Sequence, residues 1–368
     1  MTATPQRLLI RGVNWLGDAV MTTPALRRLR ECLPRTHIAL LTHAKLADLW
    51  RHHPDLDQVI AFQAGEGPLA LGRRLRDLAF DTALVLPNSP RSALEAWAAH
   101  IPRRIGLARP WRNLLLTERL PPPPGEVRMD KASAREIQRR LAQPAPRPAP
   151  PASAHQIHHY LHLAATLGAS PEPVAPRLGV LDHEVTAIRE RFGAPAGAPL
   201  FGLNAGAEYG PAKRWPADHF IATARQVRAV TGCLWWVFGG PADVPVARAI
   251  TDALNQADPG AARCLAGETS LRELCAALRA CQAVLTNDTG PMHVAAAVGT
   301  PVVVPFGSTS PELTGPGLPG DPRHRLLRAH APCAPCFLRS CPIDSRCLTG
   351  ITPAHATAAL LDVLRPGA

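Results

Sequence analysis

The sequence predicts an α/β protein built from two doubly wound domains. Its 368 residues exceed one compact domain and fit two of ordinary size. Hydrophobic residues make up 46% of the chain and charged residues 19%, which indicates sizeable cores and excludes a disordered chain. Short apolar segments alternate with segments of helical periodicity in both halves, as in parallel sheets covered by helices on both faces.

The first half begins this alternation. Strands are predicted over 7–13, 37–43 and 81–89. A helix is predicted over 19–31, after the first strand. Nine of the forty prolines lie within 121–151, where we expect surface loops around a helix at about 130–141.

A second alternation follows the segment SPEPVAPR (170–177). Strands are predicted over 199–206, 233–240, 281–288 and 300–307, and helices over 216–230, 243–256 and 270–280. We therefore expect an N-terminal domain over 1–172 and a C-terminal domain over 173–368, with the last helix packing back on the first domain. Each predicted strand of the second half ends in Gly, Asn or Asp, and ligands of open α/β sheets bind at such strand ends.

The formal net charge of +11 is concentrated in the first half. Residues 1–170 hold 23 basic and 13 acidic residues, whereas residues 171–368 hold 17 and 16. The first domain is therefore expected to meet an anionic partner, and nucleic acid, acidic phospholipid and a phosphorylated lipid all fit. No apolar run approaches the roughly 20 residues of a membrane span, and the N-terminus lacks a signal peptide's apolar core, so we expect a cytoplasmic protein.

The sharpest candidate site lies within LTNDTGPMHVAAAVGTPVVVPFG (285–307). Asp288, Thr289 and Gly290 follow a predicted strand and turn the chain into a helix. The free amides at this helix start and the Thr289 hydroxyl can hold a diphosphate, to which His293 can add a donor. Asp288 would repel phosphate, so we expect it to contact a sugar hydroxyl; a plain helix cap is the alternative.

Two further candidates follow predicted strands. Lys213 is one of only three lysines beside 37 arginines, and its ammonium can give a phosphate a compact point charge. Asp18 lies in the loop after the first strand, where a carboxylate can accept a proton from a bound hydroxyl. A solvated basic pair and a helix cap are the respective alternatives. Neither a Walker A loop nor a G-x-G-x-x-G fingerprint is present in these segments.

Four of the nine cysteines form a cluster in the sequence. Cys333, Cys336, Cys341 and Cys347 have gaps of two, four and five residues, which resembles a zinc knuckle but is less specific than paired CxxC motifs. We expect a reduced, packed loop without metal, and zinc is the open alternative. The Pro-rich stretch 143–151 and the His-rich stretch 155–162 carry no assigned role, and the latter is expected to be a helix face.

Five motifs in order resemble the ADP-heptose:lipopolysaccharide heptosyltransferases of glycosyltransferase family 9, most closely those of type II. They are NWLGDAVMTTPAL, LPNSPRSA, NAGAEYGPAKRWP, NDTGPMHVAAAVGTPVVVPFGSTSP and PCAPCFLRSCP, and the resemblance runs from about residue 7 to 365. It implies a GT-B fold, in which two facing Rossmann-like domains bind the acceptor on the N-terminal and the donor on the C-terminal side of a cleft.

The resemblance also implies an inverting transfer of heptose from ADP-L-glycero-β-D-manno-heptose to heptose I of the lipopolysaccharide inner core. By that match Asp18 is the general base and Lys213 steadies the diphosphate. The implied donor-side residues are Asn204, Gly206, Lys213, Asp243, Asp288, Thr289, Gly290 and His293. The implied acceptor-side residues are Asn14, Thr22, Thr23, Asn88 and Ser89. No metal or other cofactor is required, and peripheral contact with the inner face of the inner membrane is expected, without nucleic acid.

Alternatives of three kinds stay open. The acceptor can be that of a type I or type III heptosyltransferase. A sugar-nucleotide epimerase can share the same fold, in which case the donor's sugar changes without any acceptor. Outside the enzymes, a module can bind anionic lipid or nucleic acid through its basic half, although Lys213 and the 288–290 motif weigh against this.

Overall fold

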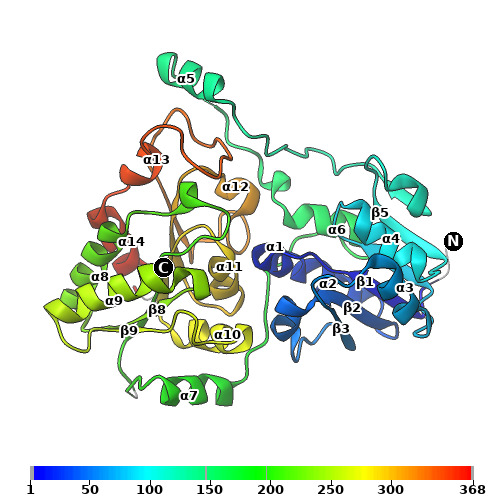
Figure 1. Cartoon of the computed structure of the whole chain (residues 1–368), viewed down its shortest axis with the longest axis horizontal. Helices are drawn as coiled ribbons and strands as arrows, with labels where there is room; N and C mark the ends of the chain where they lie inside the picture. Colours follow the sequence, from blue (N-terminus) through cyan, green and yellow to red (C-terminus); the bar gives the residue numbers. More distant parts are fainter. Residues whose placement is uncertain (1–3, 146, 196, 366–368) are drawn as a thin grey trace. The chain divides into compact units, whose positions relative to one another are not determined.

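A computed structural model describes residues 4–145, 147–195 and 197–365. The chain forms two units (Figure 1). Unit 1 comprises Met1–Glu126 and Ser153–Gly179, and unit 2 comprises Val127–Ala152 and Val180–Ala368. This division differs from the boundary expected at 172/173 in two ways. The segment 127–152 belongs to unit 2 although it precedes that boundary, and the chain passes from unit 1 to unit 2 for the last time after Gly179.

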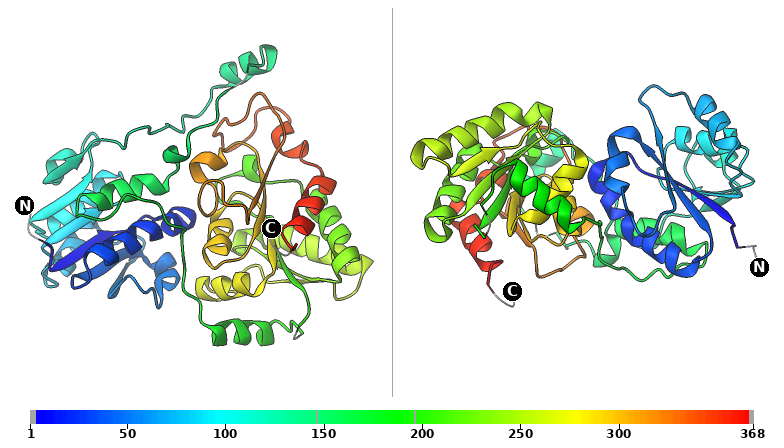
Figure 2. Two further views of the ribbon diagram at one scale, coloured as in Figure 1. Left: turned by 180° about the vertical axis from the view of Figure 1, so that it is seen from behind. Right: turned by 90° about the horizontal axis from the view of Figure 1, so that it is seen from below.

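Unit 1 is built on a six-stranded parallel sheet of order β3-β2-β1-β4-β5-β6. This sheet lies in the blue and cyan part of the chain in Figure 2. The strands are β1 (Arg7–Arg11), β2 (His37–His43), β3 (Gln58–Phe62), β4 (Thr82–Val85), β5 (Arg103–Leu107) and β6 (Glu118–Leu120). The helices are α1 (Leu16–Met21), α2 (Thr23–Cys32), α3 (Pro68–Arg76), α4 (Pro90–Ala98) and α6 (Ile157–Ala165). The strand order reverses between β1 and β4, and ligands of doubly wound sheets bind at such switch points.

The single helix predicted over 19–31 is two helices that meet at Thr22. Pro24 has no N–H to continue the hydrogen-bond ladder of α1. The hydroxyl groups of Thr22 and Thr23 instead donate to the carbonyls of Ala19 and Val20, at 2.7 and 2.8 Å. The break sets the end of α1, the helix that carries Asp18.

Unit 2 has a second six-stranded parallel sheet, of order β12-β11-β10-β7-β8-β9. Its strands are β7 (Leu200–Asn204), β8 (Leu234–Phe238), β9 (Ala262–Cys264), β10 (Ala283–Thr286), β11 (Val302–Phe306) and β12 (Arg325–Arg328). Its helices are α5 (Ala134–Ala142), α7 (Asp182–Arg191), α8 (Ala217–Thr231), α9 (Val244–Ala257), α10 (Leu271–Ala280), α11 (Gly290–Ala297), α12 (Pro311–Thr314), α13 (Arg346–Thr349) and α14 (Pro353–Asp362). The four strands and three helices predicted between 199 and 307 correspond to elements of this unit. The helix predicted to follow the 288–290 turn corresponds to α11.

Packing explains where α5 and α14 belong. Ile137 of α5 is buried in a small apolar cluster with Cys333 and Cys336, so the segment 127–152 is held by unit 2. Leu360 of α14 is buried in the main core of unit 2, where α14 packs on α8. The helix α14 is therefore part of unit 2, and its packing on the first domain stays a prediction.

Candidate active site

The carboxyl ends of β7 and β10 bring together the two donor-side motifs of unit 2. Asn204 and Thr286 are register partners, and the Asn204 amide donates to the Thr286 hydroxyl at 3.2 Å. The next residue, Asn287, donates to the Ala205 carbonyl at 2.7 Å and accepts from the Trp215 N–H at 3.0 Å. These bonds tie the loop after β7 to the end of β10, so the residues that follow both strands lie side by side.

An ion pair occupies this junction. The Lys213 ammonium lies 2.7 Å from a carboxylate oxygen of Asp288, and the two side chains are only 14% and 4% exposed. The Thr309 hydroxyl donates to the same carboxylate oxygen at 2.5 Å. Asp288 is therefore not the cap of α11, which rules out the alternative of a plain cap. The sequence argument missed Thr309 because it lies in a loop after a different strand, β11.

The start of α11 is open. Thr289 is the N-cap residue and its side chain makes no capping hydrogen bond. Pro291 has no N–H and the Met292 N–H donates to the Thr289 carbonyl at 3.1 Å, so the backbone offers an anion the Gly290 amide and the partial positive charge of the helix end. Lys213 lies at the same junction and is paired with Asp288, so it can add its positive charge to a diphosphate only by sharing it with the bound phosphate oxygens. His293, in the first turn, is buried at 5% exposure.

Gly206 and Asp243 fit closely together. A Cβ atom on Gly206 would lie 2.3 Å from a carboxylate oxygen of Asp243, so only glycine permits this contact. The same carboxylate accepts a hydrogen bond from the Gly240 N–H at 3.1 Å. Gly206 thus makes room for the carboxylate that follows β8.

Two residues missed by sequence reasoning, Tyr209 and Arg339, lie near the turn that carries Lys213. The Lys213 ammonium lies 5.0 Å from the ring centre of Tyr209, and the Arg339 guanidinium lies 5.3 Å from the same ring. The Tyr209 hydroxyl donates to the Phe337 carbonyl at 2.8 Å. The Cys-containing loop over 333–347 therefore supports the turn that carries Lys213.

Unit 1 holds a separate cavity of about 310 Å³ at the switch point of its sheet. Asp18 lines it, together with three of the expected acceptor-side residues, Asn14, Asn88 and Ser89. Its lining is completed by Val13, Trp15, Leu86, Pro87, Leu107, Gln156, His159, Tyr160 and Leu163.

The other two expected acceptor-side residues do not line this cavity. Thr22 and Thr23 are 1% and 3% exposed, and their hydroxyls bond to carbonyls of α1. Thr23 also accepts the Arg177 N–H at 3.1 Å. The expectation that these threonines face the acceptor is wrong, because their hydroxyls close the break between α1 and α2.

Buried arginines orient the two cavity asparagines. Arg11, paired with Glu95 at 2.7 Å, donates to the Asn14 side-chain oxygen at 3.0 Å. Arg112, which is 0% exposed, donates to the Asn88 side-chain oxygen at 3.3 Å. A guanidinium only donates, so both amide oxygens face arginine and both NH₂ groups remain to serve the cavity.

The His-rich stretch forms α6 and contributes to the same cavity, which the sequence did not reveal. Burial lowers the pKa of His159, and Glu126, 3.8 Å from its ring nitrogen, opposes this shift. Burial raises the pKa of Tyr160, and the nearby Asp18 charge raises it further. The cavity therefore joins one carboxylate acceptor, Asp18, to several hydrogen-bond donors, as recognition of a hydroxyl-rich ligand requires.

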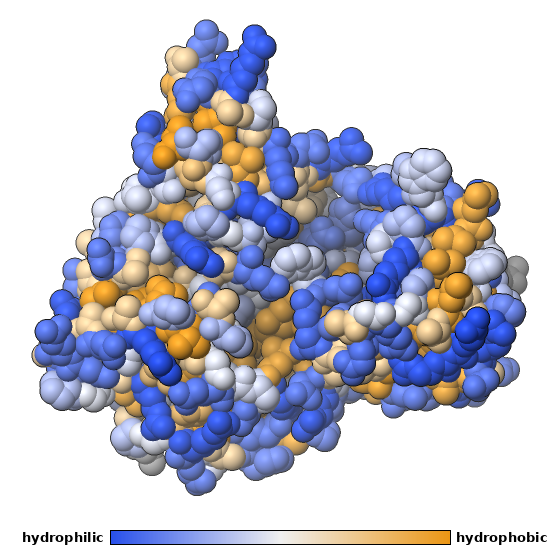
Figure 3. All heavy atoms as spheres, in the orientation of Figure 1, coloured by the Kyte–Doolittle hydropathy of each residue, from blue (hydrophilic) through white to orange (hydrophobic). Residues whose placement is uncertain are grey.

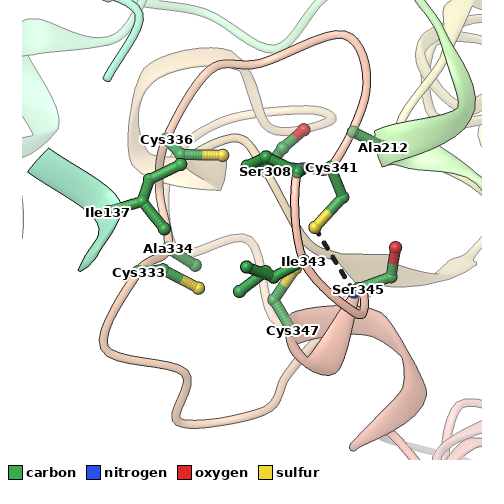
Figure 4. Close-up of a pocket in the computed structure, with 11 residues that line it drawn as sticks. Ile137, Ala212, Ser308, Cys333, Ala334, Cys336, Cys341, Ile343, Ser345 and Cys347 are labelled. Atoms are coloured by element: carbon green, nitrogen blue, oxygen red, sulfur yellow. Dashed lines mark hydrogen bonds between the residues drawn. The ribbon is translucent and has the colours of Figure 1, made fainter. Parts of the chain in front are cut away.

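The four clustered cysteines line a cavity of only about 10 Å³ in unit 2. Ile343 lines the same space and points among the sulfur atoms (Figure 4). Burial raises the pKa of Cys347 to about 12, and neighbouring thiols add to the shift. All four are free thiols, and the described residues hold no group of three His, Cys, Asp or Glu arranged for a metal ion. The metal content of the protein stays a prediction.

Comparison with known proteins agrees with this architecture. Residues 68–346 match the model of glycosyltransferase family 9 (heptosyltransferase). Lipopolysaccharide heptosyltransferase 2 of Salmonella typhimurium is 32% identical over 323 residues, which cover 84% of this chain and 85% of that protein. Lipooligosaccharide heptosyltransferase 2 of Haemophilus influenzae is 31% identical over 315 residues, with the same coverage.

A solved structure extends the match to the fold. The E. coli ADP-heptose lipopolysaccharide heptosyltransferase II has a TM-score of 0.77 at 30% identity, covering 97% of this chain and 98% of that one. The two parallel sheets with their helices are those of a GT-B glycosyltransferase, which confirms the predicted fold class. The chain therefore belongs to glycosyltransferase family 9, the heptosyltransferase family.

Proposed function

We propose that this glycosyltransferase moves heptose from ADP-heptose onto heptose I of the lipopolysaccharide inner core, with inversion at the anomeric carbon. The relatives that cover most of the chain are named heptosyltransferase 2, and one is described as acting with ADP-heptose. The observation that carries the proposal is the Lys213–Asp288 pair beside the open start of α11, because it forms a diphosphate site.

The proposed chemistry needs one base and one stabiliser of the leaving group. Asp18 accepts the proton of the acceptor hydroxyl as its oxygen bonds to the anomeric carbon. The bond between that carbon and the diphosphate oxygen breaks, and ADP leaves with the electron pair. Lys213 and the start of α11 stabilise the negative charge that develops on the diphosphate, so the step requires no metal or other cofactor.

Asp288 changes partner in this scheme. Without donor, it neutralises Lys213 at 2.7 Å. When the diphosphate binds, Lys213 is shared with the phosphate oxygens, and the Asp288 carboxylate becomes an acceptor for a heptose hydroxyl. In the absence of donor, each of these two buried charges therefore has a partner. Burying either charge without a partner would cost on the order of several kcal/mol in lost hydration.

Incubation of the enzyme with ADP-heptose and defined truncated core acceptors tests the proposal. We expect ADP release and an acceptor whose mass increases by one heptose only when heptose I is present. Transfer to an acceptor without heptose I would indicate type I activity, and transfer only to longer cores would indicate type III. A changed donor sugar without acceptor would instead support an epimerase, and polyanion binding without ADP release a binding module.

We also place the enzyme in the cytoplasm, at the inner face of the inner membrane. No helix among the described residues is long and apolar enough to cross a bilayer. The support for peripheral contact is the excess of basic residues in unit 1, 18 against 12 acidic, together with an acceptor that is anchored in lipid.

A further inference from the structure

The loop between β5 and β6 exposes two large apolar side chains. Trp111 and Leu114 are each 91% exposed, whereas the next most exposed large apolar residue in the described part of the chain, Val230, is 69% exposed. Figure 3 shows apolar side chains gathered among polar ones on the surface of unit 1 in the region of this loop. Single exposed apolar residues are common, but two such residues in one turn indicate a binding surface.

Two polar residues of the same loop, Arg112 and Asn113, make hydrogen bonds within unit 1. Arg112, between the two apolar residues, is fully buried and donates to the Pro87 carbonyl at 2.7 Å. The Asn113 side chain accepts the Arg109 N–H at 2.9 Å. The loop therefore reverses the usual arrangement, in which the charged residue faces water and the apolar residues pack inside.

The backbone holds this reversed arrangement firmly. Arg104 of β5 donates to the Leu115 carbonyl at 2.7 Å, and the Leu115 N–H donates to the Arg112 carbonyl at 2.9 Å. Trp111 has a φ of 66°, in the left-handed region that a bulky side chain rarely adopts. Such strain persists only where the surrounding contacts fix it, and it is found preferentially at functional sites.

The charges around the loop favour one kind of partner. Residues 103–119 contain five arginines, of which Arg112 is buried, Arg103 pairs with Glu118 at 2.6 Å and Arg109 pairs with Glu126 at 2.9 Å. Arg104 and the exposed Arg119 form no ion pair among the described residues. An apolar tip of tryptophan and leucine, with Arg104 and Arg119 on the adjacent strands, suits an anionic bilayer, since tryptophan prefers the membrane interface and arginine binds headgroup phosphates. A protein partner would need an apolar groove with an acidic rim.

The loop is also connected to the unit 1 cavity. Arg112 bonds to Pro87 and to Asn88, and both residues line the cavity that contains Asp18. A bilayer at the loop would thus lie beside the proposed acceptor site. We propose that residues 108–117 dock unit 1 on an anionic membrane, with Trp111 and Leu114 inserted at the interface. Docking beside the acceptor site rests on the proposed function, whereas membrane binding does not.

Vesicle co-sedimentation of the full-length protein tests this docking. The vesicles contain phosphatidylglycerol and phosphatidylethanolamine and no lipopolysaccharide, so the result is independent of heptose transfer. We expect the Trp111→Ser/Leu114→Ser variant to lose at least about tenfold in partition coefficient. Val230→Ser, an exposed apolar residue of α8 in unit 2, is the matched control and should bind as the unaltered protein does.

Two further readouts decide the interpretation. Anionic vesicles should shift the tryptophan emission of the unaltered protein to shorter wavelength, and Trp111→Ser should lose most of that shift. Transfer to a soluble truncated acceptor should be unchanged in the double variant. Equal vesicle binding by the double variant, or no binding by the unaltered protein, would overturn the proposal. Loss of soluble transfer with intact vesicle binding would assign the loop to the acceptor site instead.

Discussion

Buried guanidinium groups set the hydrogen-bonding character of the unit 1 cavity. Arg11 has a carboxylate partner in Glu95, whereas Nε and Nη2 of Arg112 have no hydrogen-bond partner in the described part of the chain. Burial lowers the pKa of Arg112 to about 10, so the group remains cationic at neutral pH. The Arg112 cation engages the Asn88 oxygen, so the Asn88 NH₂ group is left as a donor for an oxygen-rich ligand of the cavity.

Replacing Asn88 tests this orientation. Asn88→Asp keeps the shape of the side chain but exchanges the donor NH₂ group for an oxygen, and its carboxylate would pair with Arg112. We expect KM for the acceptor to rise by about tenfold, the value of one hydrogen bond, while ADP affinity is unchanged. Steady-state kinetics with varied acceptor and calorimetry with ADP provide the measurements. An unchanged KM would show that the Asn88 amide does not contact the acceptor.

Replacing Lys213 tests the donor site of unit 2. Lys213→Ala should weaken ADP binding by about 1–3 kcal/mol, the range of a charge-assisted hydrogen bond. The exposed Lys131 is a matched control, and Lys131→Ala should bind ADP normally. Lys213→Ala also leaves Asp288 without its cation, so the Lys213→Ala/Asp288→Asn variant separates lost attraction from added repulsion. Calorimetry that finds full affinity in the folded single variant would remove Lys213 from the site.

At the scale of elements, the loop over 333–347 positions the turn that carries Lys213. Gly210 has a φ of 151°, and a Cβ atom there would lie 2.5 Å from the Arg339 carbonyl oxygen. Gly210→Ala must therefore displace one of the two loops, and we expect weaker ADP binding in calorimetry. Gly232→Ala is the control, because Gly232 also has positive φ, 65°, but a Cβ there meets nothing within 4 Å. Equal ADP affinity in both variants would contradict this support.

The same loop makes a prediction about metal content. Because Ile343 occupies the space among the four sulfur atoms, we expect less than one equivalent of zinc per chain by elemental analysis. The melting temperature should not change in chelator. Stoichiometric zinc that is lost together with stability would show instead that Cys333, Cys336, Cys341 and Cys347 form a structural metal site.

The sequence predicted the positions of strands and helices better than the contacts that their side chains make. Apolar β-branched runs identified the buried strands that position both half-sites, because such runs are required in a parallel sheet. The position of His159 in the wall of the unit 1 cavity could not be predicted, since a helical pattern does not show what the helix packs against. The position of α5 was equally hidden, because it depends on contacts of Ile137 with cysteines two hundred residues later. The wrong assignment of Thr22 and Thr23 arose because a break at Pro24 uses both hydroxyls locally.

At the scale of the whole molecule, the proposed reaction divides its tasks between the two units. Unit 1 supplies Asp18 and the donors of its cavity. The net charge is shared almost evenly, because the basic segment 127–152 belongs to unit 2: unit 1 has 18 basic and 12 acidic residues, and unit 2 has 22 and 17. Unit 2 supplies Lys213, Asp288 and the start of α11. The residues assigned to each half-site come from one unit, so we expect a change in one half-site to leave binding at the other intact.

The Asp18→Asn variant tests this division most directly, with turnover and ADP-heptose affinity measured on the same preparation. An attacking hydroxyl becomes acidic only as the new bond forms, so a base acts mainly in the transition state. Asn keeps the shape of Asp18 but cannot accept the proton. We predict that turnover falls by roughly 10²–10⁴-fold while ADP-heptose affinity hardly changes. Turnover within a few-fold of the unaltered enzyme would contradict the account and show that the base is another residue.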